Sequence, residues 1–278
     1  MNRQPNHTVR ALSRTAAFAT RVVRHPSWAK AHVANLVDQK YDRLLGDWAP
    51  ELNAIEPTAA LQRMTGAGPT EIGAMRAACP RPRRKDDSPL YGSPDGSAAF
   101  LDVLYGCCRA RQPDAVIEIG VAHGFSSAAI LSALDEVQHG TLYSIDLPHL
   151  HPRATAYIGV AVDERLRSRW HLLLGPSATL VAKLPAQLGT LFDIAVHDGT
   201  HTLRGQLADY TLLWQGIKPG GLLISDDAGP AAEFFGRQVG VAPFYIDQRP
   251  KPQPIAVFEK QSNRCDGSAA RGREPNVA

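Results

Sequence analysis

The sequence predicts an α/β domain built on a seven-stranded, mostly parallel sheet with an antiparallel last strand, helices on both faces and a helical N-terminal extension. Short apolar runs alternate with helical segments after Pro113, which is typical of a parallel sheet covered on both faces. One of these runs, at 115–119, leads into a turn that contains Gly120 and Gly124. With 278 residues, of which 44% are hydrophobic, the chain is long enough to bury one substantial core.

The first 90 residues are expected to form a helical extension and a linker. Residues 10 to about 45 have a helical pattern that Pro26 interrupts. The positions expected to be buried there are Leu12, Phe18, Val22, Val23, Trp28, Val33, Leu36 and Leu44. The charged, proline-rich segment 79–89 is interpreted as the connection to the main domain. A helix is then expected at 97–110, and the side chains that should pack against the sheet are Phe100, Leu101, Leu104 and Tyr105.

Seven strands are expected after Pro113, near 115–119, 141–145, 171–174, 192–197, 222–225, 243–247 and 254–259. The segment 247–254 between the last two is too short for a crossover helix, so these strands should pair antiparallel. From residue 261 the chain is polar and rich in Gly, Ser and Arg, which favours disorder. The predicted organisation is an extension and linker at 1–90, one domain at 91–260 and a disordered tail at 261–278.

The net charge of +3 conceals an asymmetry along the chain. Residues 1–37 carry six of the 30 Lys and Arg residues and no acid, which leaves 24 basic against 27 acidic residues elsewhere. That mildly acidic remainder would be a poor surface for nucleic acid. The basic arm is interpreted first as a solvated helical extension. The alternatives are an amphipathic helix at an anionic membrane or partner surface, and a transit peptide.

The cysteines and the hydropathy favour a reducing cytosol as the compartment. The spacing fits neither a metal site nor a disulfide framework for Cys79, Cys107, Cys108 and Cys265. No apolar run approaches the roughly 20 residues of a membrane span, and we find no apolar signal-peptide segment.

The glycine turn and a following acid predict a nucleotide-binding site. Asp146 ends the next strand, 22 residues after Gly124, where α/β folds place the acid that accepts a hydrogen bond from a ribose hydroxyl. The alternative is that Asp146 merely caps a loop. Ala122 and Phe125 stand where a dinucleotide motif needs glycine, which argues against a nicotinamide dehydrogenase.

Two later strands also end in acids, at the same predicted edge of the sheet. Asp198 follows 192–197, and His201 comes three residues later. The next strand ends in Asp226 and Asp227. Three clustered carboxylates raise one another's pKa, and Mg²⁺ with its preference for oxygen ligands would relieve the repulsion. The alternatives are acids solvated by water, and a histidine that caps the next helix or pairs with Asp198.

The pattern E-x-G-x-A-x-G at 118–124 resembles motif I of class I S-adenosylmethionine (SAM) methyltransferases. From about residue 95 to residue 260 the chain is similar to methyltransferase family 24 and to the catechol and macrocin O-methyltransferases. The resemblance implies a Rossmann-like fold that binds SAM, with Glu118 facing the aminoacyl end of the cofactor. The cofactor site it implies consists of Glu118, Gly120, Ala122, Gly124, Ser126, Asp146, Ser177 and Asp198.

The resemblance also implies a metal site and a base. In metal-dependent relatives an acid, together with an acidic pair 28 and 29 residues later, binds Mg²⁺, and Asp198, Asp226 and Asp227 have this spacing. His201 stands where the catechol enzymes place the lysine that takes the substrate proton. The implied reaction is Mg²⁺-assisted O-methylation of a small-molecule hydroxyl, in a sugar, a polyketide or a catechol-like diol, and the N-terminal region often supplies the acceptor pocket.

The chain departs from these relatives at several positions. Thr200 stands where they commonly have Asp, and Pro176 replaces an acid used against the adenine amino group, so the backbone and Ser177 are expected to hold the adenine. His123 and His197 are interpreted as structural. Two other functions stay open. One is a metal-independent N- or O-methyltransferase, and the other is a non-catalytic SAM-fold module that acts through its basic arm.

Overall fold

The computed structural model describes residues 19–45, 53–82, 97–151 and 153–262. The predictions for Leu12 and Phe18, and for nearly all of the tail, lie outside these ranges. Most of the linker at 79–89 does so too.

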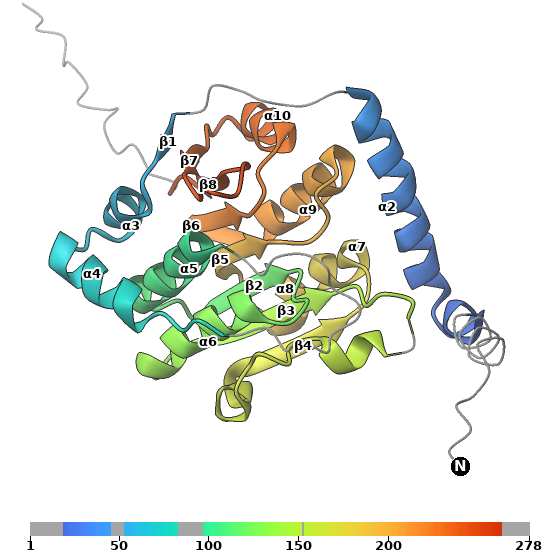
Figure 1. Ribbon diagram of the computed structural model, residues 1–278, viewed down its shortest axis with the longest axis horizontal. Helices are drawn as coiled ribbons and strands as arrows, with labels where there is room; N and C mark the ends of the chain where they lie inside the picture. The colour runs from blue at the N-terminus through green and yellow to red at the C-terminus, as the bar shows by residue number, and fades with distance from the viewer. Residues whose placement is uncertain (1–18, 46–52, 83–96, 152, 263–278) are drawn as a thin grey trace, which may run out of the picture.

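Within the described residues, one sheet of eight strands has the order β1-β7-β8-β6-β5-β2-β3-β4 (Figure 1). The strands are β1 (Ala54–Ile55), β2 (Ala115–Ile119), β3 (Thr141–Asp146), β4 (Trp170–Leu174), β5 (Phe192–His197), β6 (Ile217–Ser225), β7 (Phe244–Ile246) and β8 (Ile255–Glu259). The strands from β6 to β4 in this order are parallel, whereas β8 runs antiparallel to both β6 and β7. The seven predicted strands and the antiparallel last strand are therefore confirmed. The additional strand β1 pairs parallel with β7 at the edge.

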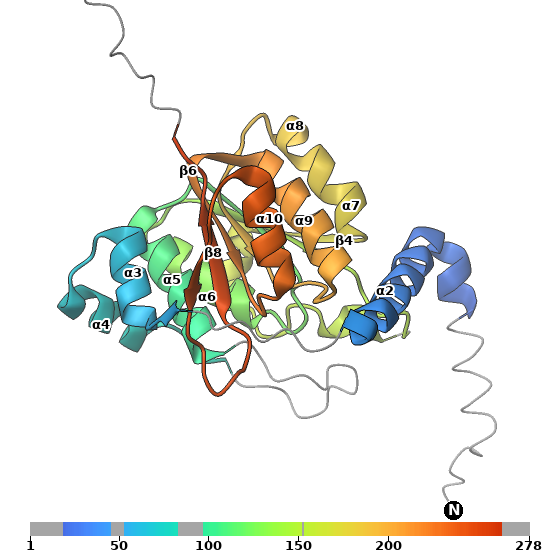
Figure 2. The same ribbon diagram turned by 90° about the horizontal axis from the view of Figure 1, so that it is seen from above.

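Helices cover both faces of the sheet, as Figure 2 shows with the sheet seen edge-on. One face carries α3 (Pro57–Thr65), α4 (Pro69–Ala78), α5 (Ala98–Arg111) and α6 (Phe125–Glu136). The other carries α7 (Ser177–Leu180), α8 (Leu184–Leu188), α9 (Leu203–Gly216) and α10 (Pro230–Val239). Short 3₁₀ helices are η1 (Ala154–Tyr157), η2 (Glu164–Arg169) and η3 (Val181–Lys183). This layering is the one expected when buried parallel strands need an apolar cover on both sides.

Helices α3 and α4, which precede the predicted domain boundary at residue 90, belong to the main core. Leu61 of α3 and Ile72 of α4 have no exposed surface and lie in the same apolar cluster as α5 and α6. A Cβ atom at Gly106 of α5 would lie 2.6 Å from Leu61 Cδ2, so glycine lets α3 approach α5 closely. The predicted domain boundary at residue 90 stays a prediction, although part of the extension already packs against the sheet.

The positions expected to be buried in residues 19–45, which include helix α2 (Pro26–Leu45), have mixed outcomes. Trp28 is buried as expected, whereas Val23, Val33 and Leu36 are exposed, so these three predictions are wrong. The reason is that α2 is attached largely through polar groups: His32 Nε2 lies 3.0 Å from the carbonyl oxygen of Pro148, and Asp42 Oδ2 accepts a hydrogen bond from the backbone N–H of Leu203 at 2.8 Å. None of the described helices is long and apolar enough to cross a membrane.

Core membership of α3 can be measured by unfolding. We expect Leu61→Ala to lower the free energy of unfolding by about 2–5 kcal/mol, because it removes a fully buried side chain and leaves a cavity. Leu36→Ala, in the exposed face of α2, is the matched control and should change it by less than about 0.5 kcal/mol. Urea unfolding measures both. Equal effects of the two variants would contradict this packing.

Candidate active site

The glycine turn after β2 is held by the carboxylate that ends β3. Asp146 Oδ2 accepts hydrogen bonds from the backbone N–H groups of Val121 and Ala122, at 2.9 and 3.0 Å. These bonds hold Ala122 in the left-handed region, at φ 46°, which is uncommon for a residue with a side chain. Burial raises the pKa of Asp146, and the two N–H groups oppose that shift. The bonds use only Oδ2, so Oδ1 is left to accept a hydrogen bond from a ligand.

Neighbouring backbone atoms leave no room for a side chain at either glycine of the turn. Gly120 has φ 91°, and a Cβ atom there would overlap the carbonyl oxygen of Asp198. Gly124 has φ 88°, and its Cβ atom would lie 2.8 Å from the Cα atom of Gly159. The turn therefore fits tightly against the loop after β5 and against the loop that follows β3.

Glu118 lies beneath the turn and does not line the cavity described below. Its carboxylate is fully buried and accepts hydrogen bonds from the hydroxyl groups of Ser126, Ser127 and Ser144, each at 2.6 Å. Burial raises the pKa of Glu118, and the three hydroxyl groups lower it. The geometry favours a positioning role in which Glu118 ties the start of α6 to β3. The direct contact with a cofactor that the resemblance implies stays a prediction.

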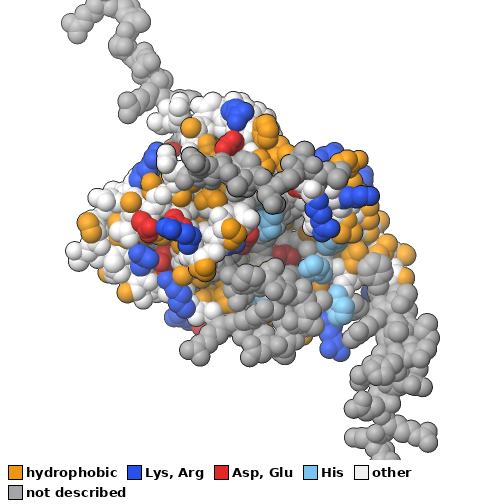
Figure 3. All heavy atoms as spheres, turned by 45° about the horizontal axis from the view of Figure 1, so that its top comes forward, with side chains coloured by type: hydrophobic (Ala, Val, Ile, Leu, Met, Phe, Trp, Pro, Cys, Tyr) orange, Lys and Arg blue, Asp and Glu red, His pale blue; other side chains and the backbone are white. Residues whose placement is uncertain are grey.

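A cavity of about 660 Å³ opens at the carboxyl ends of the parallel strands. This volume is typical of small-molecule sites, and the position is where open α/β sheets bind ligands. Histidine side chains gather on the face of the molecule shown in Figure 3. Of the predicted site residues, those that line the cavity are Gly120, Ala122, Ser126, Asp146, Ser177, Asp198, His201, Asp226 and Asp227. Glu118 and Gly124 are not among the lining residues.

The helix α2 forms one wall of this cavity through His32, Asn35 and Asp38. Thr200, in the loop after β5, donates a hydrogen bond to Asn35 Oδ1 at 2.7 Å and so joins this wall to the main domain. No pattern in residues 26–45 singles out these polar residues, because they read as the solvated face of a helix.

The three predicted metal ligands come together with a lysine between them. Lys251 Nζ lies 2.5 Å from Asp226 Oδ2 and 2.8 Å from Asp227 Oδ1. The other oxygen of Asp226 accepts a hydrogen bond from Gln248 Nε2 at 2.7 Å. Burial and then Asp226 raise the pKa of Asp198, and Lys251 opposes them. Burial lowers the pKa of Lys251, but the two aspartates outweigh it, so the pKa lies above its ordinary value.

This arrangement does not fit a divalent cation. Both carboxylate oxygens of Asp226 are already engaged, one by Gln248 and one by Lys251. An ammonium group in contact with Asp226 and Asp227 would repel a second cation. In the described part of the chain, no group of three or more His, Cys, Asp or Glu residues is arranged to hold a metal ion. The Mg²⁺ site predicted at Asp198, Asp226 and Asp227 stays a prediction, and it would need Lys251 to move away from Asp226 and Asp227.

His201 lies at the cavity wall, with Nε2 at 3.6 Å from Asp227 Oδ2. It neither caps α9 nor shows a described pairing with Asp198. The cap is Thr202, whose Oγ1 accepts a hydrogen bond from the N–H group of Gly205 at 3.2 Å. Desolvation at the cavity wall lowers the pKa of His201, and Asp227 opposes that shift.

A buried polar network lies at another part of the cavity wall. Ser177 donates a hydrogen bond to Asp209 Oδ1 at 2.6 Å, and Asp209 Oδ2 lies 3.2 Å from His197 Nε2. His197 has no exposed surface, in keeping with a structural role. Asp209 of α9 lines the cavity, and the sequence analysis did not select it. The available signal was an acid beside Tyr210 on the apolar face of that helix.

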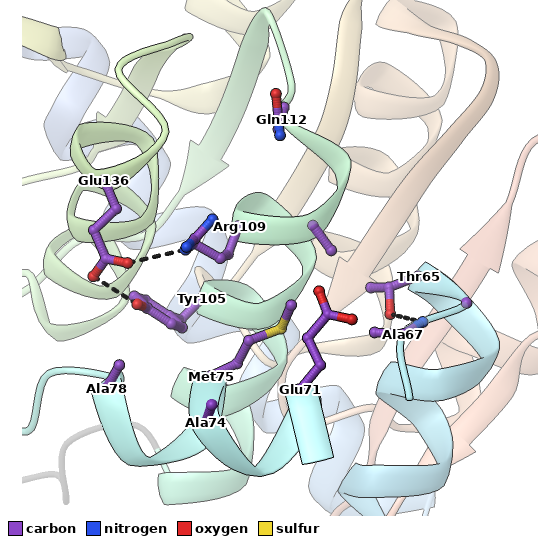
Figure 4. Close-up of a pocket in the computed structure, with 12 residues that line it drawn as sticks. Thr65, Ala67, Glu71, Ala74, Met75, Ala78, Tyr105, Arg109, Gln112 and Glu136 are labelled. Atoms are coloured by element: carbon purple, nitrogen blue, oxygen red, sulfur yellow. Dashed lines mark hydrogen bonds and ion pairs between the residues drawn. The ribbon is translucent and has the colours of Figure 1, made fainter. Parts of the chain in front are cut away.

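A second cavity, of about 470 Å³, lies among α3, α4 and α5, away from the glycine turn and the acidic cluster (Figure 4). Glu136 at its edge accepts hydrogen bonds from Tyr105 OH at 2.6 Å and from Arg109 Nε at 3.0 Å. Burial and Glu136 raise the pKa of Tyr105. The cavity at the strand ends is therefore the better candidate for the active site.

Comparison with known proteins identifies the class. Residues 117–228 match the model of methyltransferase family 24, which is described as "Methyltransferase domain". The fold resembles TomG, an O-methyltransferase from Streptomyces achromogenes involved in tomaymycin synthesis and solved with SAM, at 15% identity and a TM-score of 0.51. That alignment covers 81% of this chain and 96% of TomG. An O-methyltransferase from Bacillus cereus in complex with S-adenosylhomocysteine (SAH) aligns at 16% identity and a TM-score of 0.46, over 80% and 97% of the two chains. No curated protein sequence matches this chain.

Fold, cavity and family match together define a class I methyltransferase. Residues 117–228, from within β2 to just past the acids that follow β6, match this methyltransferase family model, and the chain is a SAM-dependent methyltransferase. The SAM-dependent methyltransferase class expected from the sequence is thereby confirmed, whereas the expected Mg²⁺ stays a prediction.

The role of Asp146 can be tested by cofactor binding. Asp146→Asn removes a charged acceptor, so we expect the affinity for SAH to fall about ten- to a hundredfold. The matched control is Asp193→Asn, because Asp193 also bonds a backbone N–H group, that of Ala115, but near the amino ends of the strands. Isothermal titration calorimetry gives both affinities. Unchanged binding by a folded Asp146→Asn protein would remove Asp146 from the cofactor site.

Proposed function

We propose that this methyltransferase transfers the methyl group of SAM to a hydroxyl group of a small-molecule acceptor. The observation that carries the proposal is that one cavity joins the glycine turn with Asp146 to the cluster around Asp198, His201 and Lys251. A donor bound at the first end and an acceptor bound at the second would therefore lie side by side. Holding two reactants in this way supplies much of the catalysis in group transfer.

The residues at the glycine turn fit SAM. Asp146 offers Oδ1 to ribose hydroxyl groups, and Ser177 with Asp209 lies where the resemblance places the adenine. The N-terminal end of α6, next to Ser126, suits the negative carboxylate of the methionine part. When bound, SAM supplies an electrophilic methyl group on sulfur.

The residues at the other end fit an acceptor hydroxyl. His201 reaches the cavity, and its lowered pKa leaves it neutral near pH 7. The acceptor oxygen forms a bond to the methyl carbon as the bond from that carbon to sulfur breaks, and the hydroxyl proton passes to a ring nitrogen of His201. The products are a methyl ether and SAH. His32 and Asn35 of α2 bound the acceptor's space, which limits it to a small molecule.

Mg²⁺ assistance, as implied by the family resemblance, would require Lys251 to leave Asp226 and Asp227. The same site would also serve a metal-independent O-methyltransferase, and the contacts of Lys251 favour that reading. Methylation at nitrogen is the second alternative, and the panel of acceptors described below distinguishes it. A non-catalytic role of the basic arm is the third; residues 1–18 of that arm lie outside the described part of the chain.

Labelled SAM tests the proposed function. The full-length protein, SAM labelled in the methyl group and a panel of small phenols, catechols, sugars and amines are incubated together, and the labelled products are identified by mass spectrometry. We expect label on oxygen of a hydroxyl compound. Label only on amines, or SAH binding without transfer to any compound, would contradict O-methylation.

His201 is expected to take the acceptor's proton. With the acceptor found in that panel, His201→Gln should lower kcat by roughly 10² to 10⁴, the usual contribution of a general base, and should leave SAH affinity unchanged. The matched control is His139→Gln, because His139 is about equally exposed and also pairs with an aspartate, Asp114. Since Thr202 caps α9, His201→Gln should leave the free energy of unfolding within about 0.5 kcal/mol of wild type. A wild-type kcat in this variant would show that His201 is not the base.

A further inference from the structure

The loop between β7 and β8 delivers Lys251 to the acidic cluster and is built to hold it there. Gln248, which is buried, donates hydrogen bonds to Asp226 Oδ1 at 2.7 Å and to the carbonyl oxygen of Gln253 at 2.8 Å. Its side-chain oxygen accepts a hydrogen bond from Ser97, the residue that caps α5. The loop is thus fastened on both sides of Lys251, so the position of its ammonium group is a property of the fold.

The ammonium group is only partly used by these contacts. A lysine has three N–H donors: one bonds Asp226 Oδ2, and a second side of the ammonium group faces Asp227 Oδ1 in an ion pair at 2.8 Å. Within the described residues, no further side chain contacts Nζ at ion-pair distance. The lysine side chain lines the cavity and keeps 23% of its surface exposed. The third donor is therefore available to a molecule in the cavity.

We propose that Lys251 takes the place of a divalent cation in this active site and binds the acceptor oxygen with its third N–H group. The acceptor part of this inference rests on the proposed O-methylation. The charge balance does not, because it concerns only the contacts of Lys251 with Asp226 and Asp227. An ammonium group stabilises the negative charge that develops on the acceptor oxygen as His201 removes the proton.

A lysine in place of a divalent cation changes which acceptors the site can hold. A divalent cation can hold two adjacent substrate oxygens at once, which is the reason to expect a vicinal diol. An ammonium group with one remaining donor holds a single oxygen. The acceptor therefore needs one hydroxyl group beside Lys251, and a second hydroxyl group on the neighbouring carbon is not required.

A Mn²⁺ titration of full-length protein, followed by electron paramagnetic resonance, tests the charge balance without any acceptor. Wild type should show no specific site at millimolar Mn²⁺. Lys251→Met removes the ammonium group and keeps an apolar stem of similar length, so it should create a site at least about tenfold tighter than any in wild type. The double variant Lys251→Met with Asp227→Asn should lose that site again.

The matched control is Arg249→Ala, which removes one positive charge from the same loop. Arg249 is largely exposed and pairs with Asp247 outside the cluster, so this variant should behave as wild type. If Lys251→Met does not fold, the Mn²⁺ titration of wild type alone still tests the proposal. A Mn²⁺ site in wild type that Asp227→Asn abolishes would overturn the proposal.

The acceptor part is tested with the compound identified by the labelled panel. Transfer should persist in EDTA, and an analogue without a neighbouring hydroxyl group should have a kcat/KM within about threefold of the parent. Loss of activity in EDTA, or a strict need for two adjacent hydroxyl groups, would overturn it. A titration of wild type with SAH distinguishes failure of the proposed function from failure of this inference. If wild type does not bind SAH, the proposed function is wrong. The Mn²⁺ titration still tests whether Lys251 replaces a divalent cation.

Discussion

The rest of the site depends on one constraint, which is that parallel strands deliver their terminal acids to a single edge of the sheet. β6, β5, β2 and β3 are neighbours, so the acids at their carboxyl ends share a small, partly buried volume. Each negative charge there must be matched. The turn's backbone N–H groups match Asp146, three serine hydroxyl groups match Glu118, and Lys251 with Gln248 matches Asp226.

These matches also give the cavity its two ends. Asp146 holds the glycine turn, and Glu118 ties α6 and β3 together beneath it, so that end is rigid and suited to SAM. At the other end the β7–β8 loop and α2 come from distant parts of the chain and enclose the part of the cavity where we propose that the acceptor binds.

Sequence patterns predict the sheet well, because a strand buried on both faces leaves a continuous apolar run and a parallel crossover needs a helix. They also bring Asp198, Asp226 and Asp227 to one edge. The role of Lys251 is not visible in the sequence, since a lysine in a proline-rich loop reads as solvated and its contacts depend on how that loop folds back. The contacts of Glu118 with three serines were not visible either, because they depend on β2 directing its side chain under the turn; its predicted contact with the cofactor stays a prediction. The positions of Asp209 and of the polar face of α2 at the cavity wall were not predicted, because helical spacing alone does not reveal which neighbour a polar residue contacts.

The most direct test of the account is a crystal structure grown with SAH and Mn²⁺, with data collected at the manganese absorption edge. The account predicts SAH across the glycine turn beside Asp146, with the ammonium group of Lys251 between Asp226 and Asp227 and no anomalous peak in the cluster. A manganese peak bound by Asp198, Asp226 and Asp227, with Lys251 turned away, would contradict it.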